Sequence, residues 1–410
     1  MPTDQISRTR VSRPHLDELD VVRPVASLLV IVTHTMQTFA SGGSLFYGAI
    51  LLQSEASRHI FFFVSAMVLT YQAYGRPRRS VGAFWRRRFA TVCVPYVLWV
   101  LIYTLLGVAG LHGYTIPVPP VTGTPLQVLE RIGILLVTGP GHLYFVPVLV
   151  QFYLVFPVLL WVLERGRRYH LALAGLALAA QVALTVILHY RHATLLVWQD
   201  VDSTREVTSY TFYLVAGAVT GAHLTEARDW VWRHRWPLLV AAALVTAGVE
   251  AWYVLTVQAG ATPNSASDPF APELIASYLA VILLLWLAGA WWAARQRGGW
   301  RSRLVRTLSD NSFGVYLSHA VILDILVTFA LVPHAPWPAE VLLALAVAWS
   351  GGSLLTVVLA RTPLSRWLTG RARRPLTGGP PPTGRGATGE PDQSVRQGSG
   401  FAERSAARLR

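Results

Sequence analysis

Length, composition and charge place this chain in a membrane. Of its 410 residues, 53% are apolar and only 14% are charged, whereas an ordinary soluble domain has about 45–50% and about 25%. The single cysteine, Cys93, excludes a disulfide scaffold and a zinc site built from cysteines. The 35 basic residues are all arginines and exceed the 21 acidic residues by a net charge of +14. Because they are spread between apolar segments, nucleic acid is not an expected partner.

Ten apolar segments predict membrane-spanning helices. A helix needs about 20 residues to cross a hydrocarbon layer about 30 Å thick. In chain order the segments cover residues 21–40, 60–75, 89–110, 143–163, 171–189, 208–224, 237–257, 274–294, 313–332 and 339–360. The second and the sixth are short, so their ends are the least defined. We therefore predict an all-α fold, a polytopic membrane bundle of about ten transmembrane helices.

The arginines predict the orientation of these helices, because short cytoplasmic loops retain positive charge during insertion. With a cytoplasmic amino terminus, the internal loops carry 17 arginines and the two termini carry 14. The external loops carry four, namely Arg58, Arg131, Arg191 and Arg205. Both termini are therefore predicted to be cytoplasmic. Cleavage of a signal peptide near Thr38 is the alternative reading of the first segment, but it would invert this charge distribution.

The chain divides into three parts. Residues 1–20 form a cytoplasmic amino-terminal segment, and residues 21–360 form the transmembrane domain. Residues 361–410 form a basic cytoplasmic tail whose Pro, Gly, Ser, Thr and Arg content predicts disorder. A contact between this tail and anionic lipid is the alternative to a plain extension.

Polar side chains inside the apolar segments are the candidates for function, because ionisable groups are costly at membrane depth. His34 lies eleven residues after Arg23. Eleven helical steps of about 100° bring the two side chains within roughly 20° of one face, about 16 Å apart. A lone histidine in an apolar helix is more often a hydrogen-bonding group between helices. This pair alone therefore does not predict catalysis.

Five segments together resemble the acyltransferase-3 family of integral membrane acyl transferases. Residues 19–34 resemble its Asp-x-x-Arg pattern followed by ten residues and a histidine. Residues 61–71 resemble its Phe-Phe-x-x-Ser-Gly stretch, with Ala66 in place of glycine. Residues 84–96, 141–157 and 312–319 complete the set in the family's order. One departure is His59, which stands where the family often has an acidic residue and bears on the identity of the acceptor.

The resemblance implies transfer of an acyl group from acyl-CoA, a co-substrate, to a hydroxyl of a saccharide or other cell-envelope acceptor. A hydroxyl is a poor nucleophile, so a base must remove its proton, and a neutral imidazole suits that task. We assign this role to His34. Asp324 lies as deep in the ninth segment and is expected to orient the imidazole, unless it only bonds a neighbouring helix.

The donor and acceptor sites are expected at opposite ends of the bundle. Arginine suits the phosphates of coenzyme A because it offers paired donors in one plane. Arg86, Arg87 and Arg88 lie at the inner rim, where at most two share a face; the resemblance favours Arg86 and Arg88, with Arg23 as a third contact. Tyr316 and His319 either line the donor path or pack the bundle. The acceptor side is expected to include His142, Tyr144, Gln151 and Glu250, for which an interfacial belt or a contact between helices is the alternative.

No metal and no permanently bound cofactor is expected, and the oligomeric state is not predicted. The expected partners are the donor, the acceptor and the lipid bilayer, and the expected location is the cytoplasmic membrane. Two other functions fit the same pattern of spans. The first is an exporter or flippase of a glycan or lipid-linked intermediate, which inverted repeats with broken helices would favour. The second is a non-catalytic scaffold, which leaves the shared face of Arg23 and His34 without a purpose.

Overall fold

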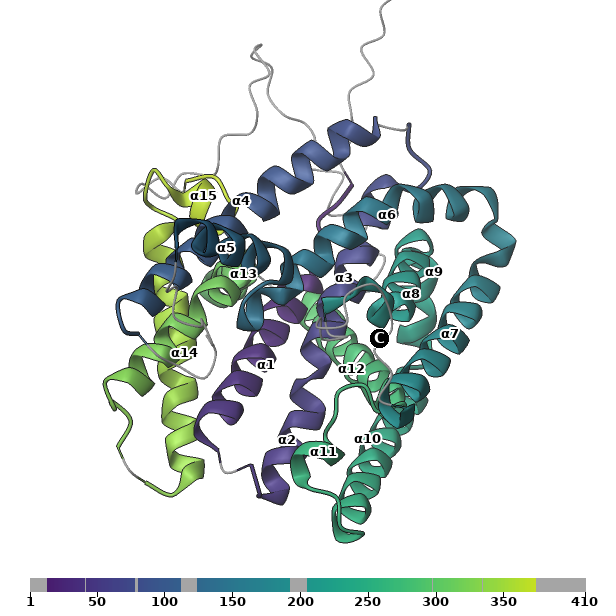
Figure 1. Ribbon diagram of the computed structural model, residues 1–410. Coiled ribbons are helices and arrows are strands. Elements are labelled where there is room, and N and C mark those ends of the chain that lie inside the picture. Colours follow the sequence, from purple (N-terminus) through teal and green to yellow (C-terminus); the bar gives the residue numbers. More distant parts are fainter. Residues whose placement is uncertain are drawn as a thin grey trace, which may run out of the picture.

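The computed structural model describes residues 13–40, 42–77, 80–111, 124–191, 205–296, 298–333 and 335–373. All regular structure in these residues is helical, as predicted, and they contain no strand. Figure 1 shows the helices gathered into one bundle. Eight of them are long and apolar enough to cross a membrane, and they are α1 (Leu19–Phe39), α4 (Val81–Val108), α6 (Phe145–Arg165) with the turn before it, α7 (His170–Arg191) with the turn before it, α10 (Arg235–Gln258), α12 (Leu274–Arg295), α13 (Gly299–Thr328) and α14 (Trp337–Leu359). These eight correspond to eight of the ten predicted spans.

The other two predicted spans are the short ones, and they pack closely on each other. They correspond to α3 (Ala56–Ala73) and to α8 (Thr211–Ala222), which follows the single turn η4 (Val207–Tyr210). A Cβ atom at Gly217 would collide with the backbone carbonyl of Phe63, and one at Gly221 with that of Met67. Two glycines four residues apart thus let the backbones of α3 and α8 approach, as small residues do in membrane bundles. Because protein surrounds them, these helices do not need the length of a helix exposed to lipid.

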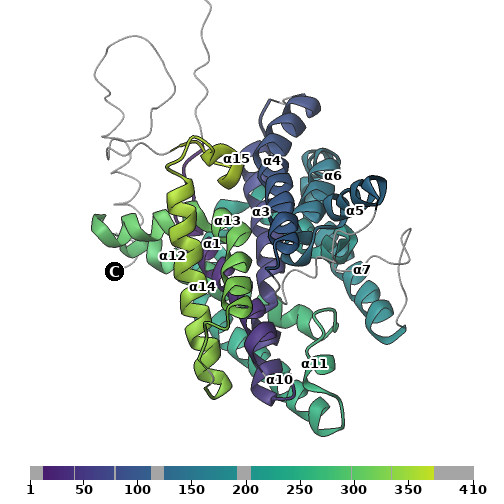
Figure 2. The ribbon, with the colours of Figure 1, turned by 60° about the vertical axis from the view of Figure 1, so that its left-hand side comes forward.

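Five further helices lie outside the predicted spans. They are α2 (Leu45–Ser54), α5 (Pro125–Thr138), α9 (Leu224–Arg233), α11 (Pro263–Ala266) and α15 (Ser365–Thr369). At 14 residues, α5 is too short to cross the membrane. It begins with a proline and a capping box in which Thr124 and Gln127 bond each other, so its start is fixed locally. Figure 2 shows it beside α6 at the edge of the bundle.

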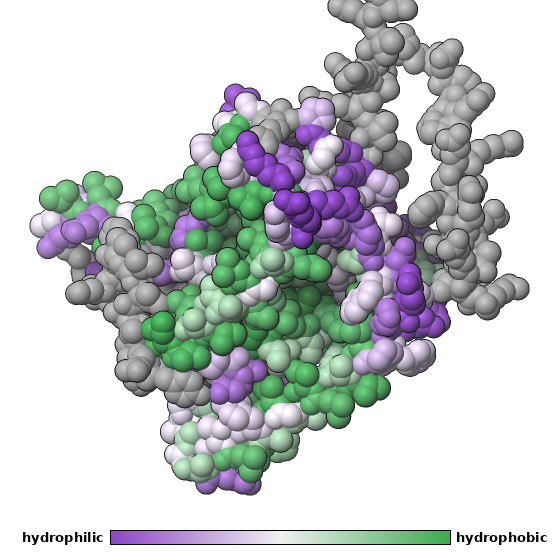
Figure 3. Space-filling model, turned by 90° about the vertical axis from the view of Figure 1, so that its right-hand side faces the viewer, coloured by the Kyte–Doolittle hydropathy of each residue, from purple (hydrophilic) through white to green (hydrophobic). Residues whose placement is uncertain are grey.

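The centre of the bundle is formed by α1 and α13, which are the most deeply buried of the eight candidate spans. Each contacts the other and both contact α14. Most of the other spans present much of their surface outward as apolar side chains. On the face in Figure 3, such side chains cover the middle and polar side chains gather towards one margin. Polar groups carried by α1 and α13 are thus the ones most shielded from lipid.

Both described ends of the chain lie at the same end of the bundle. Arg23, near the start of α1, interacts electrostatically with Arg371, which forms an ion pair with Asp310 of α13 at 2.7 Å. The tail predicted to be disordered from residue 361 first forms α15, which packs on α4, where the indole of Trp99 donates to the carbonyl of Leu368 at 2.9 Å. Residues 374–410 and 1–12 lie outside the described residues. The arrangement agrees with termini on one side, and their cytoplasmic location stays a prediction.

Candidate active site

Three histidines from distant parts of the chain meet inside the bundle. His34 of α1 faces His319 of α13 with ring centroids 5.5 Å apart, and His142 lies 4.7 Å from His319 and 5.9 Å from His34. His142 and His319 are buried. We call these residues the histidine cluster. His34 was predicted as the base, His319 on the donor side and His142 on the acceptor side, and the structure brings all three to one place.

The turn between α5 and α6 directs His142 into the bundle. Gly139 and Gly141 both have positive φ angles, 72° and 48°, which other residues rarely adopt. They flank Pro140 and redirect the backbone into η1 (Gly141–Tyr144), a single turn before α6. The hydroxyl of Tyr316 donates a hydrogen bond to the backbone carbonyl of His142. This bond ties η1 to α13 and gives Tyr316 a positioning role at the cluster.

The hydrogen bonds of the cluster define where protons can go. The Nδ1 atom of His319 lies 2.8 Å from the carbonyl oxygen of Tyr316, which can only accept, so Nδ1 carries the hydrogen. In the neutral ring, Nε2 then has a lone pair, and this buried atom has no hydrogen-bond partner among the described residues. Neither ring nitrogen of His142 makes a hydrogen bond of normal geometry with any residue that the structure describes. His34 is hydrogen-bonded by Gln37, which the sequence did not single out. These buried nitrogens therefore have hydrogen-bonding capacity that the described residues do not use.

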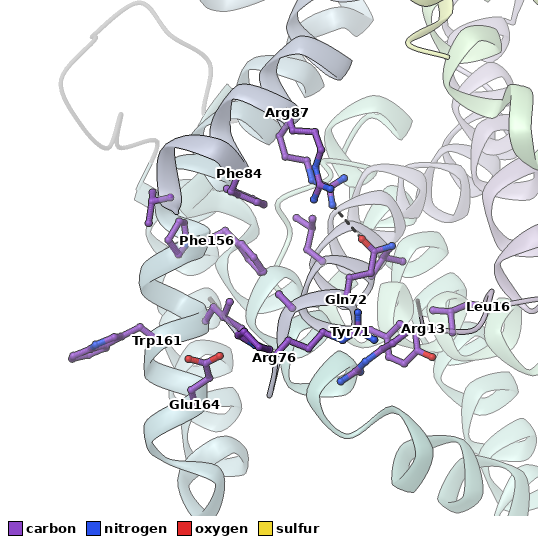
Figure 4. Close-up of a pocket in the computed structure, with 18 of the residues that line it drawn as sticks. Arg13, Leu16, Tyr71, Gln72, Arg76, Phe84, Arg87, Phe156, Trp161 and Glu164 are labelled. Atoms are coloured by element: carbon purple, nitrogen blue, oxygen red, sulfur yellow. Dashed lines mark hydrogen bonds between the residues drawn. The ribbon is translucent and has the colours of Figure 1, made fainter. Parts of the chain in front are cut away.

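A large cavity opens at the end of the bundle that carries most arginines. Its volume is about 1210 Å³. Five arginines line it, from the segment before α1, from α1, from the α3–α4 connection and from α4: Arg13, Arg23, Arg76, Arg87 and Arg88. Among the described residues that line it, Glu164 is the single acid, and Phe84, Phe156 and Trp161 are aromatic. In Figure 4 the side chains of Arg13, Arg76 and Arg87 lie around the cavity, whereas the indole of Trp161 extends away from its centre. We call this cavity the arginine cavity.

Contacts along its wall hold the arginine cavity in shape. The guanidinium of Arg13 lies 4.6 Å from the ring centre of Tyr71 and donates to the carbonyl of Tyr74 at 2.9 Å. Burial against α3 lowers the pKa of Arg13 from its usual value. Arg88 donates to Gln72 at 3.3 Å. The segment before α1 is thereby fastened to the helix on the other side of the cavity.

The arginine cavity does not include all of the arginines favoured from the sequence. Arg23 and Arg88 line it, but Arg86 is exposed and outside the lining, whereas Arg87 takes part in it. Residues 100° apart on a helix face different ways, so at most two of these three neighbours can point into one cavity. The two are Arg87 and Arg88. Arg87, which the sequence did not favour, thus faces the cavity together with Arg88, and Arg86 does not.

The arginine cavity and the histidine cluster lie on one helix face. α1 is continuous from Leu19 to Phe39, so the helical register between Arg23 and His34 is kept. Eleven residues correspond to a rise of about 16 Å, or three turns. Arg23 belongs to the cavity wall, and His34 belongs to the cluster. α1 therefore connects the arginine cavity to the three imidazole rings of the histidine cluster, which lie deeper in the bundle.

The remaining predicted residues lie around the cluster at different distances. Tyr144 contacts the guanidinium of Arg58, 5.8 Å from its ring centre. Asp324 is buried and interacts electrostatically with Tyr103, whose ring centroid is 5.4 Å from that of His142. Both therefore belong to the surroundings of the cluster.

Gln151 and Glu250 make contacts that fasten neighbouring segments. The side chain of Gln151 bonds the carbonyl of Arg205 and the amide of Val207, each at 3.0 Å. Glu250 accepts a hydrogen bond from Gln53 of α2 at 2.8 Å. The bond of Glu250 matches the alternative that the sequence left open for it, a contact between helices. The alternative for Gln151 was an interfacial belt, and its bonds to the segment before α8 were not predicted.

Arg58 is a buried charge that the sequence placed in an external loop. The second span was predicted to begin at residue 60, but α3 begins at Ala56, so Arg58 lies in its first turn. It forms an ion pair with Glu55, and the two side chains are 13% and 6% exposed. A helix that begins with a charged turn resembles a loop in a hydropathy pattern, which is why the sequence missed this pair.

Within the described residues, one group of side chains has the spacing to hold a metal ion. It consists of His15, Asp17 and Asp20, before and at the start of α1. His15 and Asp20 already bond each other at 3.0 Å, and two of the three residues are exposed. The group lies at the rim of the arginine cavity through His15. The histidine cluster lies about four turns deeper along α1, counted from Asp20 to His34.

Comparison with known families agrees with this architecture. A family model described as an acyltransferase domain, of the acyltransferase-3 type, matches residues 16–360. No curated protein and no solved structure matches the chain. The matched residues run from the segment before α1 to the end of α14 and include the histidine cluster and the wall of the arginine cavity, except for Arg13, Pro14 and His15. The chain is therefore a multi-pass membrane protein that belongs to the acyltransferase-3 family.

Proposed function

We propose that this acyltransferase moves an acyl group from acyl-CoA to a hydroxyl of a saccharide or other cell-envelope acceptor, and that it does so in the cytoplasmic membrane. The observation that carries the proposal is the position of His34. It stands in the histidine cluster and on the same face of α1 as Arg23, a wall residue of the arginine cavity. One helix thus carries a residue for the charged phosphates of acyl-CoA and, three turns away, a residue for the reaction at the uncharged thioester.

The arginine cavity suits the nucleotide end of the donor. Coenzyme A carries a pyrophosphate and a ribose phosphate, which favour guanidinium groups that donate two parallel hydrogen bonds. Arg23, Arg87 and Arg88 are our assigned contacts, and the exposed Arg86 keeps only an accessory role at the rim. The aromatic residues Phe84 and Trp161 supply flat apolar surface for a base.

The histidine cluster suits the transfer step. His34 takes the proton of the acceptor hydroxyl while the oxygen attacks the thioester carbon, and the carbonyl oxygen becomes negative. Collapse of this intermediate breaks the carbon–sulfur bond, and the protonated His34 returns the proton to the departing thiolate. His142, with both ring nitrogens unused, is our assigned contact for the thioester oxygen, and His319, whose Nε2 lone pair can only accept, is assigned to a hydroxyl of the acceptor. Tyr316 and Asp324 position these rings.

The test uses purified protein in nanodiscs with acetyl-, propionyl- and succinyl-CoA and with saccharides released from the cell envelope. Thiol release gives the rate, and mass analysis of the saccharide gives the group transferred. His34→Ala is expected to lower the rate by about 10²-fold or more, since a general base contributes about 10²–10⁴. His234→Ala is the matched control, because His234 lies between α9 and α10, away from the histidine cluster, and bonds the carbonyl of Trp230. Full turnover by His34→Ala would remove it as the base.

The same preparation separates the enzyme from an exporter. Reconstituted into sealed vesicles, a flippase would translocate a labelled glycan without releasing any thiol from acyl-CoA. We expect thiol release that depends on the saccharide. Translocation with no acyl transfer for any donor would overturn the proposal.

A further inference from the structure

Arg58 occupies an unusual place for a charged side chain. It lies in the first turn of α3, inside the bundle, with an exposed fraction of 13%. A charge at membrane depth is costly unless it has a partner or a function. Glu55 supplies a partner one turn earlier and is itself buried. The ion pair with Glu55 explains why a charged side chain can be buried here. It uses the Nη2 atom of Arg58 and does not explain the position of Nη1.

The guanidinium retains an unused donor next to the histidine cluster. Its Nη1 atom is buried and has no hydrogen-bond partner in the described residues. The group lies beside Tyr144, two residues after His142 on the same turn, and it hydrogen-bonds Tyr210. Its charge acts on the ring of His34. A cationic donor thus stands at the edge of the place where His34, His142 and His319 meet.

The surroundings of Arg58 strengthen the interaction that its unused N–H group can make with a negative charge. Besides Glu55, it interacts with the rings of Tyr144, Tyr210 and Tyr278, which carry no formal charge, and with the imidazoles of His34 and His59. The amino-terminal end of a helix adds partial positive charge, and α3 has 18 residues. Fixed donors in a site shielded from water stabilise a developing negative charge far better than water does.

We propose that Arg58 stabilises the negative oxygen that forms when the acceptor hydroxyl attacks the thioester. This inference rests on the function proposed above. As the new carbon–oxygen bond forms, the carbonyl electron pair moves to oxygen, and the Nη1–H of Arg58 donates to that oxygen. When the carbon–sulfur bond breaks, the carbonyl reforms and the hydrogen bond weakens. Arg58 thus stabilises the negative oxygen, and His34 transfers the proton.

A paired substitution tests this role without stranding a buried charge. Removing Arg58 alone would leave Glu55 buried and unpaired, which is strongly destabilising. The double variant Arg58→Gln with Glu55→Gln replaces the ion pair by two neutral amide side chains. The matched control is Glu18→Gln with Arg228→Gln, another ion pair, in which Arg228 Nε lies 2.8 Å from Glu18 Oε1. Gel filtration and thermal unfolding establish that each variant is folded.

The expected result is a loss of kcat by about 10²–10³-fold in the Arg58 and Glu55 double variant, the range found for removal of one oxyanion donor. The KM and the directly measured Kd for acetyl-CoA are expected to stay within twofold of wild type, because Arg58 is not part of the arginine cavity. The control variant is expected to keep both parameters. A purely structural role for Arg58 would not produce this separation of kcat from donor binding.

Three outcomes would overturn the inference. The first is a folded double variant that transfers at the wild-type rate, and the second is a loss that appears only as weaker acetyl-CoA binding. If the double variant does not fold, Arg58→Lys replaces it, because lysine keeps the charge but not the planar geometry of the donors; a wild-type kcat in that variant is the third. Absence of acyl transfer by the wild-type protein would instead refute the proposed function itself.

Discussion

Arg86 and Arg87 are adjacent in the sequence but differ in what they face, which makes them a sharp test of the donor site. Arg87 lines the arginine cavity, and Arg86 is exposed outside it. If the cavity binds the phosphates of acyl-CoA, Arg87→Gln removes one charged donor from the ligand. Arg86→Gln removes the same charge from the same turn of α4 without changing the cavity wall.

The size of the effect follows from the exposure of the site. A hydrogen bond to a charged group contributes about 1.5–3 kcal/mol, and exposed charge pairs contribute less, about 0–1 kcal/mol. Arg87 is exposed in the unliganded protein, so we expect a loss of about 1–1.4 kcal/mol, which is about a five- to tenfold increase in Kd. Long-range attraction is shared by both arginines and is weakened by salt, so Arg86→Gln should change Kd by less than twofold at physiological ionic strength.

Isothermal titration of acetyl-CoA into each variant in nanodiscs measures these constants directly. Acyl transfer at saturating donor provides a second measurement, because kcat should be unchanged in both variants. Equal weakening by the two substitutions would mean that the rim attracts the donor without a defined contact. Weakening by Arg86→Gln alone would place the phosphates on the other face of α4 and would refute the assignment of the cavity.

Two further substitutions test the packing that forms the site. Gly217→Ala places a methyl group against the carbonyl of Phe63 and should destabilise the protein by about 1–3 kcal/mol, whereas Gly175, with nothing within 4 Å, should tolerate alanine; thermal unfolding in detergent compares them. Tyr316→Phe leaves the buried carbonyl of His142 without its donor, at a cost of about 1–3 kcal/mol, and should lower kcat more than donor affinity. An unchanged unfolding temperature in both Gly217→Ala and Tyr316→Phe would contradict the packing described here.

The membrane spans could be predicted because apolar length is a local property of the sequence. The prediction was least defined at residues 60–75 and 208–224, and there the structure has α3 and α8, which pack on each other through Gly217 and Gly221. Hydropathy reports the exposure of a helix to lipid and not its contacts with protein. Short helices inside a bundle are therefore where such a prediction is weakest.

The members of the site could be predicted, but their convergence could not. His34, His142 and His319 each stand out as polar residues in apolar segments, yet only tertiary packing brings η1 between α1 and α13. Arg87 was passed over because the orientation of α4 around its own axis is not written in the sequence. Arg58 was misplaced because its ion pair with Glu55, which allows a charged turn inside the bundle, depends on where α3 begins.

The separation of the arginine cavity from the histidine cluster has a consequence for how the residues contribute. Under the proposed function, the phosphates of the donor stay at the level of Arg23, where the arginine cavity offers several charged donors, and only the thioester end reaches the cluster. Interactions with the nucleotide are the same before and during transfer, and such uniform binding changes KM without raising kcat. Contacts at the cluster are made with a carbonyl that gains negative charge, so they act on kcat. A helix that keeps the two places about three turns apart thus lets the charge that captures the donor and the neutral groups that react with it be optimised independently.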